Sequence, residues 1–261
     1  GDDWWCQGYS EPGAGSDLAS LRTKAERDGD HYIVNGHKIW TTLAQYANWM
    51  FCLVRTSNEG KPQEGISFLL IDMNTPGIEV KPIITVDGGH EVNEVFLEDV
   101  KVPVENLVGE ENMGWTIAKF LLGNERTGIA GVARSKKAID KLKEIAKSEL
   151  NNGEPLINDS SFNKKITELE VDLTALEFTE LRTLAKESQG QGPGVESSIL
   201  KIKGTEIQQK ISELTLEAIG NYASPYITPL SVRNFGSNYL EVGPEHTQGV
   251  AQNYFGMRKT S

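Results

Sequence analysis

The stretch Tyr9-Ser-Glu-Pro-Gly-Ala-Gly-Ser-Asp17 is rich in Gly, Pro and hydroxyl side chains, and Asn35-Gly-His-Lys-Ile-Trp-Thr-Thr42 follows it. Glycine lets the backbone adopt positive φ and removes the Cβ that would hold a ligand away from the main chain. The second stretch adds the aromatic plane of Trp40 beside two hydroxyls. Together they indicate a site for a flat, polar-edged heterocycle with phosphates. Either stretch alone is also explained by a turn between strands and a core tryptophan.

Composition narrows the class of protein. The 261 residues suffice for one large domain or two ordinary ones. A net charge of −11 argues against nucleic acid as a general partner. Cys6, Cys52 and four scattered histidines show no metal-ligand spacing, so we expect no metal site. A chain of this size does not need a disulfide, so we expect a reducing, cytoplasmic compartment. No apolar run approaches the ~20 residues that a membrane span needs.

The pattern of residues changes character after Pro103. Short β-rich runs separated by turns predict strands at 31–36 (running into a turn), 49–54, 65–71, 78–82 and 92–97. Helix formers then predict helices over about 113–150, 160–188 and 197–219. We therefore expect an α+β fold, with an antiparallel β sandwich or barrel domain at 1–108 followed by an α-helical bundle domain at 109–261.

The order Ser-Glu-Pro-Gly-Ala-Gly-Ser-Asp, then Asn-Gly-x-Lys-x-Trp-x-Thr, resembles the acyl-CoA dehydrogenase family of flavoenzymes. The resemblance implies that the two domains are the family's middle β domain and its C-terminal helical domain, incomplete at its end. The family's N-terminal helical domain and its closing flavin-packing segment are not matched. We therefore expect the sequence to be an internal portion of a longer protein, that is, a fragment of the acyl-CoA dehydrogenase fold.

The resemblance also assigns a cofactor and its contacts. It implies FAD, bound by a set of residues from both motifs: Gln7, Tyr9, Ser10, Ser16, Trp40, Thr41 and Thr42. Ser16, Gly123, Asn124 and Arg126 correspond to positions that contact the acyl-CoA substrate. An exposed helical turn is an equally good interpretation of Asn124.

Glu125 is the expected catalytic base. Positions 121, 125, 128 and 132 would share one face of a continuous helix, and the other residues there are Leu, Gly and Val. Burial of a carboxylate on such a face raises its pKa and its basicity. In one branch of the family the base lies here, in a Glu-Arg pair; in the other branch it would lie beyond Ser261. The alternative is a surface pair or structural salt bridge between Glu125 and Arg126.

The resemblance implies α,β-dehydrogenation of an acyl-CoA thioester to the trans-2-enoyl-CoA, with hydride transfer to flavin N5 and reoxidation by an electron-transfer flavoprotein. Leu121-Leu-Gly-Asn-Glu-Arg-Thr-Gly-Ile-Ala130 and Gly88-Gly-His-Glu-Val-Asn-Glu-Val-Phe96 most resemble the large subunits of bacterial pimeloyl-CoA-type dehydrogenases. Two alternatives stay open: an acyl-CoA oxidase-like enzyme, and a non-catalytic scaffolding subunit of a heteromeric dehydrogenase.

Asp159 bears on assembly. In Asp159-Ser-Ser-Phe162 an acid stands where the family often has an arginine that crosses to another subunit's flavin pyrophosphate. Because an acid repels a pyrophosphate, we expect a homo- or hetero-oligomer in which a second dehydrogenase subunit supplies that arginine.

Overall fold

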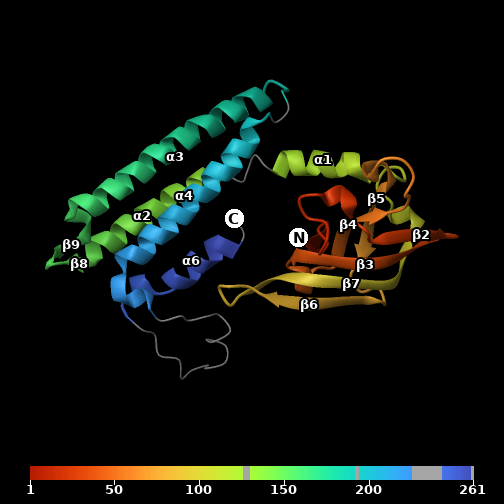
Figure 1. Cartoon of the computed structure of the whole chain (residues 1–261), viewed down its shortest axis with the longest axis horizontal. Helices are drawn as coiled ribbons and strands as arrows, with labels where there is room; N and C mark the ends of the chain where they lie inside the picture. The colour runs from red at the N-terminus through yellow and green to blue at the C-terminus, as the bar shows by residue number, and fades with distance from the viewer. Residues whose placement is uncertain (126–129, 192–193, 225–242, 260–261) are drawn as a thin grey trace. The chain divides into compact units, whose positions relative to one another are not determined.

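The structure is a computed structural model that describes residues 1–125, 130–191, 194–224 and 243–259. The chain divides into two compact units, one formed by Gly1–Thr85 with His90–Leu121 and the other by Val86–Gly89 with Leu122–Ser261. The first unit carries a β-sheet and the second is mainly helical (Figure 1). This arrangement confirms the predicted fold class, in which a β domain precedes a helical bundle.

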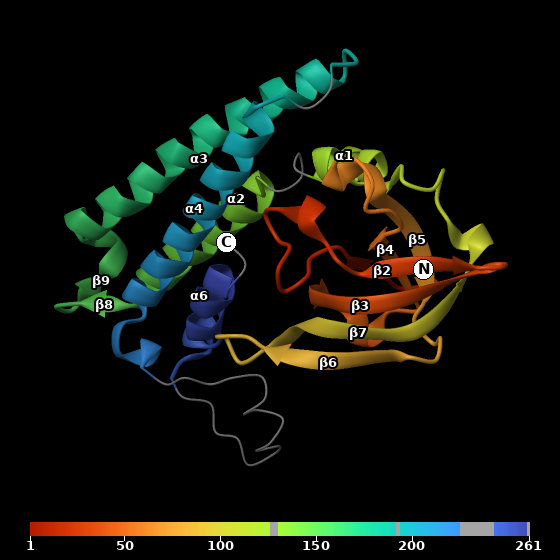
Figure 2. The ribbon, with the colours of Figure 1, turned by 45° about the vertical axis from the view of Figure 1, so that its right-hand side comes forward.

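Seven strands form the sheet of the first unit. They are β1 (Trp5–Gly8), β2 (Lys24–Asp28), β3 (His31–Thr42), β4 (Trp49–Arg55), β5 (Ile66–Asp72), β6 (Ile78–Ile84) and β7 (His90–Pro103). Their order is β1-β4-β2-β3-β7-β6, with β5 paired to β4, and Figure 2 shows β3, β7 and β6 side by side. The sheet is mainly antiparallel, although β1 and β2 pair parallel with β4.

The core of this unit comes from the inward positions of the strands. Its buried side chains include Cys6, Tyr32, Val34, Met50, Cys52, Leu69, Ile71, Val95, Leu97 and Val100. Full burial of an aliphatic side chain stabilises a fold by roughly 1.5–3 kcal/mol.

Short 3-10 helices complete the connections in both units: η1 (Leu18–Ser20), η2 (Ala44–Tyr46), η3 (Pro62–Gly65), η4 (Val104–Asn106), η6 (Leu156–Asn158), η7 (Gly220–Ala223) and η9 (Glu245–Thr247).

Strand β3 is longer than predicted. It continues through Gly36 to Thr42, so the expected turn after Asn35 is wrong. Gly36 is needed for a different reason, because a Cβ there would lie 2.7 Å from the Cα of Thr23. Close approach of two backbones is a common reason for glycine within a strand. Because β3 continues to Thr42, the Trp40 motif lies on a strand.

The single helix expected over 113–150 is also wrong. Helix α1 (Gly114–Glu125) ends before α2 (Val132–Ser148), and Gly131 precedes α2 with a left-handed φ of 60°. A left-handed residue interrupts a right-handed helix. Leu121 and Val132 therefore belong to different helices, so the face predicted to run from 121 to 132 is not one continuous helical face. Gly128 lies outside the described residues.

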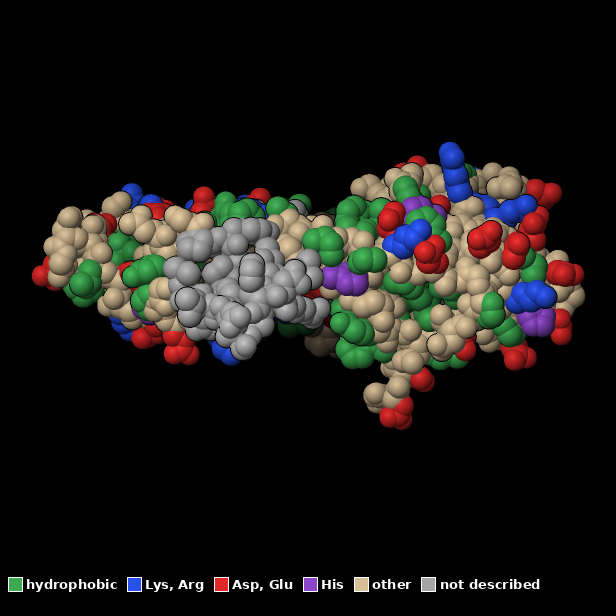
Figure 3. Space-filling view, turned by 90° about the horizontal axis from the view of Figure 1, so that it is seen from below, with side chains coloured by type: hydrophobic (Ala, Val, Ile, Leu, Met, Phe, Trp, Pro, Cys, Tyr) green, Lys and Arg blue, Asp and Glu red, His purple; other side chains and the backbone are tan. Residues whose placement is uncertain are grey.

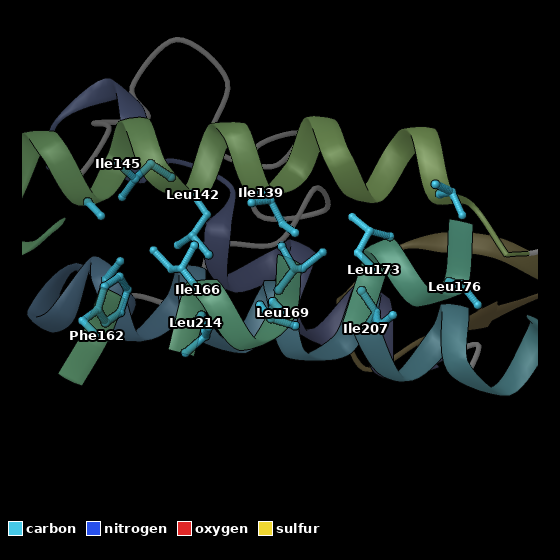
Figure 4. Packing of buried hydrophobic residues seen from close by; sticks show 14 of the residues in the cluster. Ile139, Leu142, Ile145, Phe162, Ile166, Leu169, Leu173, Leu176, Ile207 and Leu214 are labelled. Atoms are coloured by element: carbon cyan, nitrogen blue, oxygen red, sulfur yellow. The ribbon is translucent and has the colours of Figure 1, made fainter. Parts of the chain in front are cut away.

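The helical unit has one apolar core. Helices α2, α3 (Ser160–Glu187) and α4 (Glu196–Ala218) supply most of it, and α6 (Val250–Lys259) adds Val250. Figure 4 shows Ile139, Leu142 and Ile145 of α2 facing Ile166, Leu169 and Leu173 of α3. The spacing of Ile166, Leu169 and Leu173 along the chain is the helical periodicity that predicts α3 from the sequence. A small hairpin of β8 (Leu150–Asn151) and β9 (Glu154–Pro155) joins α2 to η6.

Asp159 caps the N-terminus of helix α3. Its Oδ1 accepts hydrogen bonds from the backbone N–H groups of Ser161 and Phe162, both at 2.9 Å. An aspartate at this N-cap satisfies amide groups that the helix itself leaves unpaired, and its charge suits the positive end of the helix dipole. An arginine could accept neither bond, which gives a local physical reason for the acid.

Charged residues are distributed over the surface. Acidic and basic side chains lie interspersed on the face of the β unit shown in Figure 3. Within the described ranges, no helix combines the length and apolar character that crossing a membrane requires. The same residues contain no group of three or more His, Cys, Asp or Glu that could hold a metal ion.

Candidate functional site

A β-bulge near the end of β3 sets the direction of the Trp40 side chain. Lys38 pairs with Val95 and Thr41 pairs with Asn93, so β3 contains one residue more than β7 in this interval. Trp40 lies within this bulge, and its backbone is in the left-handed conformation, with φ of 59°. Positive φ is rare for a bulky residue, and such outliers concentrate at functional sites.

The bulge separates the two threonines of the motif. Trp40 is 57% exposed and Thr42 is exposed, whereas Thr41 is only 1% exposed. An extra residue shifts the two-residue alternation of a strand by one. Trp40 and Thr42 therefore project on the outer side, and Thr41 projects inward, away from them.

The carbonyl oxygen of Thr41 is held by Asn93. The fully buried Asn93 donates from Nδ2 to this oxygen at 3.0 Å and to Oε1 of Gln45 at 2.6 Å. Its own Oδ1 lies 2.7 Å from Nε2 of His90. This network fixes the end of β3 immediately after the bulge.

The Gly-rich loop lies directly against β3. The backbone N–H of Ile39 donates to the carbonyl oxygen of Ser10 at 2.9 Å, and Nζ of Lys38 donates to the carbonyl oxygen of Tyr9 at 3.2 Å. Ser10 makes the first of these contacts itself, and Trp40 directly follows Ile39, so Ser10 and Trp40 are neighbours. The structure thus brings the two sequence motifs together.

A buried ion pair makes the third link between the motifs. Nζ of Lys38 lies 2.8 Å from Oε1 of Glu11, and these side chains are 0% and 8% exposed. Burial alone would raise the pKa of Glu11. The positive charge of Lys38 and hydrogen bonds from Lys38, Thr23 and Arg22 outweigh it, so the pKa of Glu11 lies below its ordinary value.

The remaining predicted residues of the first unit occupy different environments. Gln7 is half-buried on β1, and Ser16 is exposed in the loop before η1. The ring of Tyr9 is buried, edge-on to Phe51 and Phe68 at centroid distances of 5.9 and 6.3 Å. Tyr9 thus belongs to the core of the β unit, whereas Ser16 is accessible.

Two of the predicted substrate residues, Gly123 and Asn124, and the predicted base Glu125 belong to the last turn of α1. Gly123 is half-buried within this helix. Asn124 and Glu125 are its last two residues, and their side chains are outside the described part of the structure. Arg126 lies outside the described residues altogether. The roles of these four residues stay predictions.

Both cysteines are free and buried. Burial, and to a smaller extent the neighbouring Cys52, raises the pKa of Cys6 to about 12. Burial also raises the pKa of Cys52, to about 11. A protonated thiol is a poor nucleophile and a poor metal ligand. These cysteines therefore contribute to packing rather than to chemistry.

The outer side of β3 fits a planar heterocycle. The exposed indole of Trp40 offers an aromatic plane, and the Thr42 hydroxyl lies two residues along the same strand. The Gly-rich loop approaches β3 at Ser10. Farther along this loop, Cβ atoms added to Gly13 and Gly15 would meet no atom within 4 Å, so its backbone borders open space. An aromatic plane, a hydroxyl and accessible backbone amides are groups that bind a ring with polar edges.

Neither Glu11 nor Lys38 is among the residues predicted from the sequence, although both lie within the quoted motifs. One signal could have indicated them: Tyr32 and Val34 point inward at every second position, and this alternation reaches Lys38. A lysine at an inward position needs a buried partner. Glu11, the acid of the Gly-rich loop, is a candidate for that partner.

Comparisons with known proteins agree with this architecture. The family model described as acyl-CoA dehydrogenase, middle domain, matches residues 6–100, and the model described as acyl-CoA dehydrogenase, C-terminal domain, matches residues 112–233. Acyl-CoA dehydrogenase FadE34 of Mycobacterium tuberculosis is 39% identical over 218 residues, which are 83% of this chain and 30% of that protein. Acyl-CoA dehydrogenase FadE29 of the same organism is 37% identical over 226 residues, which are 86% of this chain and 58% of that protein.

A solved structure shows the same fold. The ChsE4-ChsE5 complex from Mycobacterium tuberculosis contains a chain with a TM-score of 0.78 and 30% identity, covering 99% of this chain and 65% of that chain. The present chain thus spans between 30% and 58% of the length of the two curated relatives named above. With both of its units matched by family models, the chain belongs to the acyl-CoA dehydrogenase family, of which it comprises the middle domain and C-terminal domain sequence.

Proposed function

We propose that this chain forms the flavin-binding and substrate-binding part of an FAD-dependent enzyme that oxidises an acyl-CoA thioester to the trans-2-enoyl-CoA. The observation that carries the proposal is the outward placement of Trp40 and Thr42 beside the loop backbone at Ser10. Family membership supports it, because the family is one of flavin-dependent dehydrogenases.

In this proposal, Trp40 and Thr42 cover one face and the edge of the flavin ring, and Ser10 binds its polar edge. Gln7, Tyr9, Ser16 and Thr41 complete the predicted set, with Thr41 and the Tyr9 ring acting from the buried side. When bound, FAD supplies a hydride acceptor at N5. The chain's own contribution is to hold that ring in place and to keep water from it.

Glu125 is the proposed base that removes the α-proton of the thioester, and the hydrogen on the β-carbon leaves as hydride. Gly123, Asn124, Arg126 and Ser16 are proposed to hold the acyl-CoA. A carboxylate in such a position accepts one proton per turnover, and the product gains its double bond between the α- and β-carbons. The sequence match at Glu125, the last residue of α1, supports this role.

Anaerobic mixing of the FAD-loaded protein with acyl-CoA esters of different chain length tests the proposal. The expected result is loss of the flavin's visible absorbance together with formation of the trans-2-enoyl-CoA. FAD-loaded protein that leaves every ester unchanged would contradict it and favour a scaffolding subunit. Admission of oxygen then separates two enzymes: rapid hydrogen peroxide release indicates an oxidase, and slow release indicates a dehydrogenase that needs an electron-transfer flavoprotein.

We further propose a heteromeric enzyme of the kind formed by pimeloyl-CoA-type large subunits, located in the cytoplasm, where both cysteines would stay free. Asp159 supports the second subunit, because no arginine stands at this position to reach a flavin pyrophosphate. The solved ChsE4-ChsE5 complex shows that a related chain pairs with a different one. Native mass spectrometry should find one FAD per heterodimer. A partner-free protein that holds one FAD per chain with full activity would overturn the heteromer and leave the dehydrogenase standing.

A further inference from the structure

The ion pair between Glu11 and Lys38 lies at the junction of the two motifs. Lys38 is fully buried on β3, two residues before Trp40, and Glu11 is the residue after Ser10. Glu11 is therefore adjacent in sequence to one residue of the proposed flavin site, and Lys38 is two residues from another. Neither side chain reaches the outer surface where Trp40 and Thr42 project.

The carboxylate of Glu11 is bonded on both oxygens. Oε1 accepts hydrogen bonds from Nζ of Lys38 at 2.8 Å and from the backbone N–H of Thr23 at 2.9 Å, and Oε2 accepts from the backbone N–H of Arg22 at 2.6 Å. Lys38 donates a second bond, to the carbonyl oxygen of Tyr9. The pair thus joins three segments: the Gly-rich loop, residues 22–23 and the bulged end of β3.

Net stability does not explain why a buried pair occurs here. Apolar side chains of similar volume generally stabilise a core as well as a buried ion pair does, or better. What an ion pair adds is a defined geometry, because its hydrogen bonds are satisfied in only one arrangement of the groups. Here that geometry sets the position of the Gly-rich loop relative to β3, and with it the separation of Ser10 from Trp40 and Thr42.

We propose that Glu11 and Lys38 are positioning residues that hold the Gly-rich loop and the end of β3 at the separation needed to bind the flavin ring. The inference rests on the proposed function and deepens it, since neither residue contacts the cofactor. Loss of the pair would leave Trp40 and Thr42 intact and misplace the opposite side of the site, at Ser10.

The experiment compares a single variant, Glu11→Gln, with the double variant Glu11→Gln/Lys38→Met, by thermal melting and by titration with FAD. The single variant leaves the ammonium of Lys38 buried without its counter-charge, so its Tm should fall. The double variant removes both charges, so its Tm should return toward that of wild type. Its Kd for FAD should nevertheless rise at least about tenfold, the equivalent of one lost hydrogen bond, and the visible spectrum of the bound flavin should shift.

A matched control is the exposed pair of Lys24 and Glu26 on β2, whose side chains are 55% and 65% exposed. Lys24→Met/Glu26→Gln should leave Tm and FAD affinity unchanged. A double variant at Glu11 and Lys38 with wild-type Tm, Kd and flavin spectrum would overturn the positioning role alone. All titrations use the full-length protein together with its partner subunit, and a wild-type complex that binds no FAD would overturn the proposed function and this inference with it.

If the double variant does not fold, Glu11→Asp decides instead. It keeps the charge and withdraws the carboxylate by one methylene, so the three donors can be satisfied only if the loop moves. The positioning role predicts folded protein with weaker FAD binding and a shifted flavin spectrum. Unchanged affinity and spectrum in folded Glu11→Asp would contradict it.

Discussion

Ile39 donates its backbone N–H to the carbonyl oxygen of Ser10 across 2.9 Å. This bond joins a loop rich in glycine to a strand with a bulge, two segments that lie well apart in the sequence. Because both partners are backbone atoms, the contact depends on the path of the chain rather than on either side chain. The path in turn depends on the close approach at Gly36, the bulge at Trp40 and the ion pair of Lys38.

Gly36→Ala tests the close approach of the two backbones. The added Cβ would lie 2.3 Å from Oγ1 and 2.7 Å from Cα of Thr23, so β3 and the segment at Thr23 must separate. Overpacking of this kind costs about 1–3 kcal/mol of unfolding free energy, measured by urea denaturation. Gly15→Ala is the control, because its Cβ would meet nothing within 4 Å. Equal stability of the two variants would argue against the backbone contact.

Glu125→Gln tests the proposed base. Glutamine keeps the shape of the side chain and cannot take a proton, and loss of a general base slows a reaction by about 10²–10⁴-fold. The rate of flavin bleaching by a good acyl-CoA, measured by stopped flow, should fall by at least the lower figure while FAD stays bound. A near-normal rate would place the base elsewhere, as in the family branch whose base would lie beyond Ser261.

Asp159→Ala tests the cap of α3. The variant removes the acceptor for the amides of Ser161 and Phe162 and should lower the unfolding free energy by about 1 kcal/mol. Asp159→Asn keeps an acceptor oxygen, so its unfolding free energy should differ from that of wild type by only a few tenths of ~1 kcal/mol. Urea denaturation of both variants provides the comparison. Asparagine as costly as alanine would mean that charge, and not the cap, is what matters.

Acid sensitivity tests the electrostatics of Glu11. Its pKa in the folded protein lies below its ordinary value, so ionised Glu11 stabilises the fold at any pH above that ordinary value. The contribution disappears as pH falls through the folded-state pKa. Near pH 7, Glu11→Gln should cost about 3–5 kcal/mol. The gap to wild type should narrow as unfolding is measured below about pH 4. A gap that stays constant on acidification would contradict this account.

Much of the architecture was predictable because it depends on local periodicity. Ile166, Leu169 and Leu173 repeat at helical spacing, and α3 follows from them. The two motifs identify the family, whose domain order the structure shares. The break between α1 and α2 was not predictable in the same way. Glycine within a helix costs only about 1 kcal/mol relative to alanine, so Gly131 alone does not decide between interruption and continuation.

The site itself depends on pairing between distant strands. Trp40 and Thr42 lie on the outer side, rather than the inner side that Lys38 occupies, only because β7 has one residue fewer than β3 across the bulge. Nothing local to the motif shows this, which is why Thr41 and Thr42 look equivalent in the sequence. For Lys38, the inward alternation of β3 could have indicated a need for a buried partner, but Glu11 becomes adjacent only when the loop folds onto β3.

The most direct test of the flavin site is the affinity of the Trp40→Ala protein for FAD, followed by the flavin's visible absorbance. The control is Trp4→Ala, because Trp4 is comparably exposed, at 51% against 57%, and lies outside the two motifs. Loss of the exposed indole should raise the Kd of Trp40→Ala by at least about tenfold, as expected for one stacked aromatic contact, while Trp4→Ala binds like wild type. Unchanged affinity and an unchanged flavin spectrum in Trp40→Ala would contradict the assignment of the site.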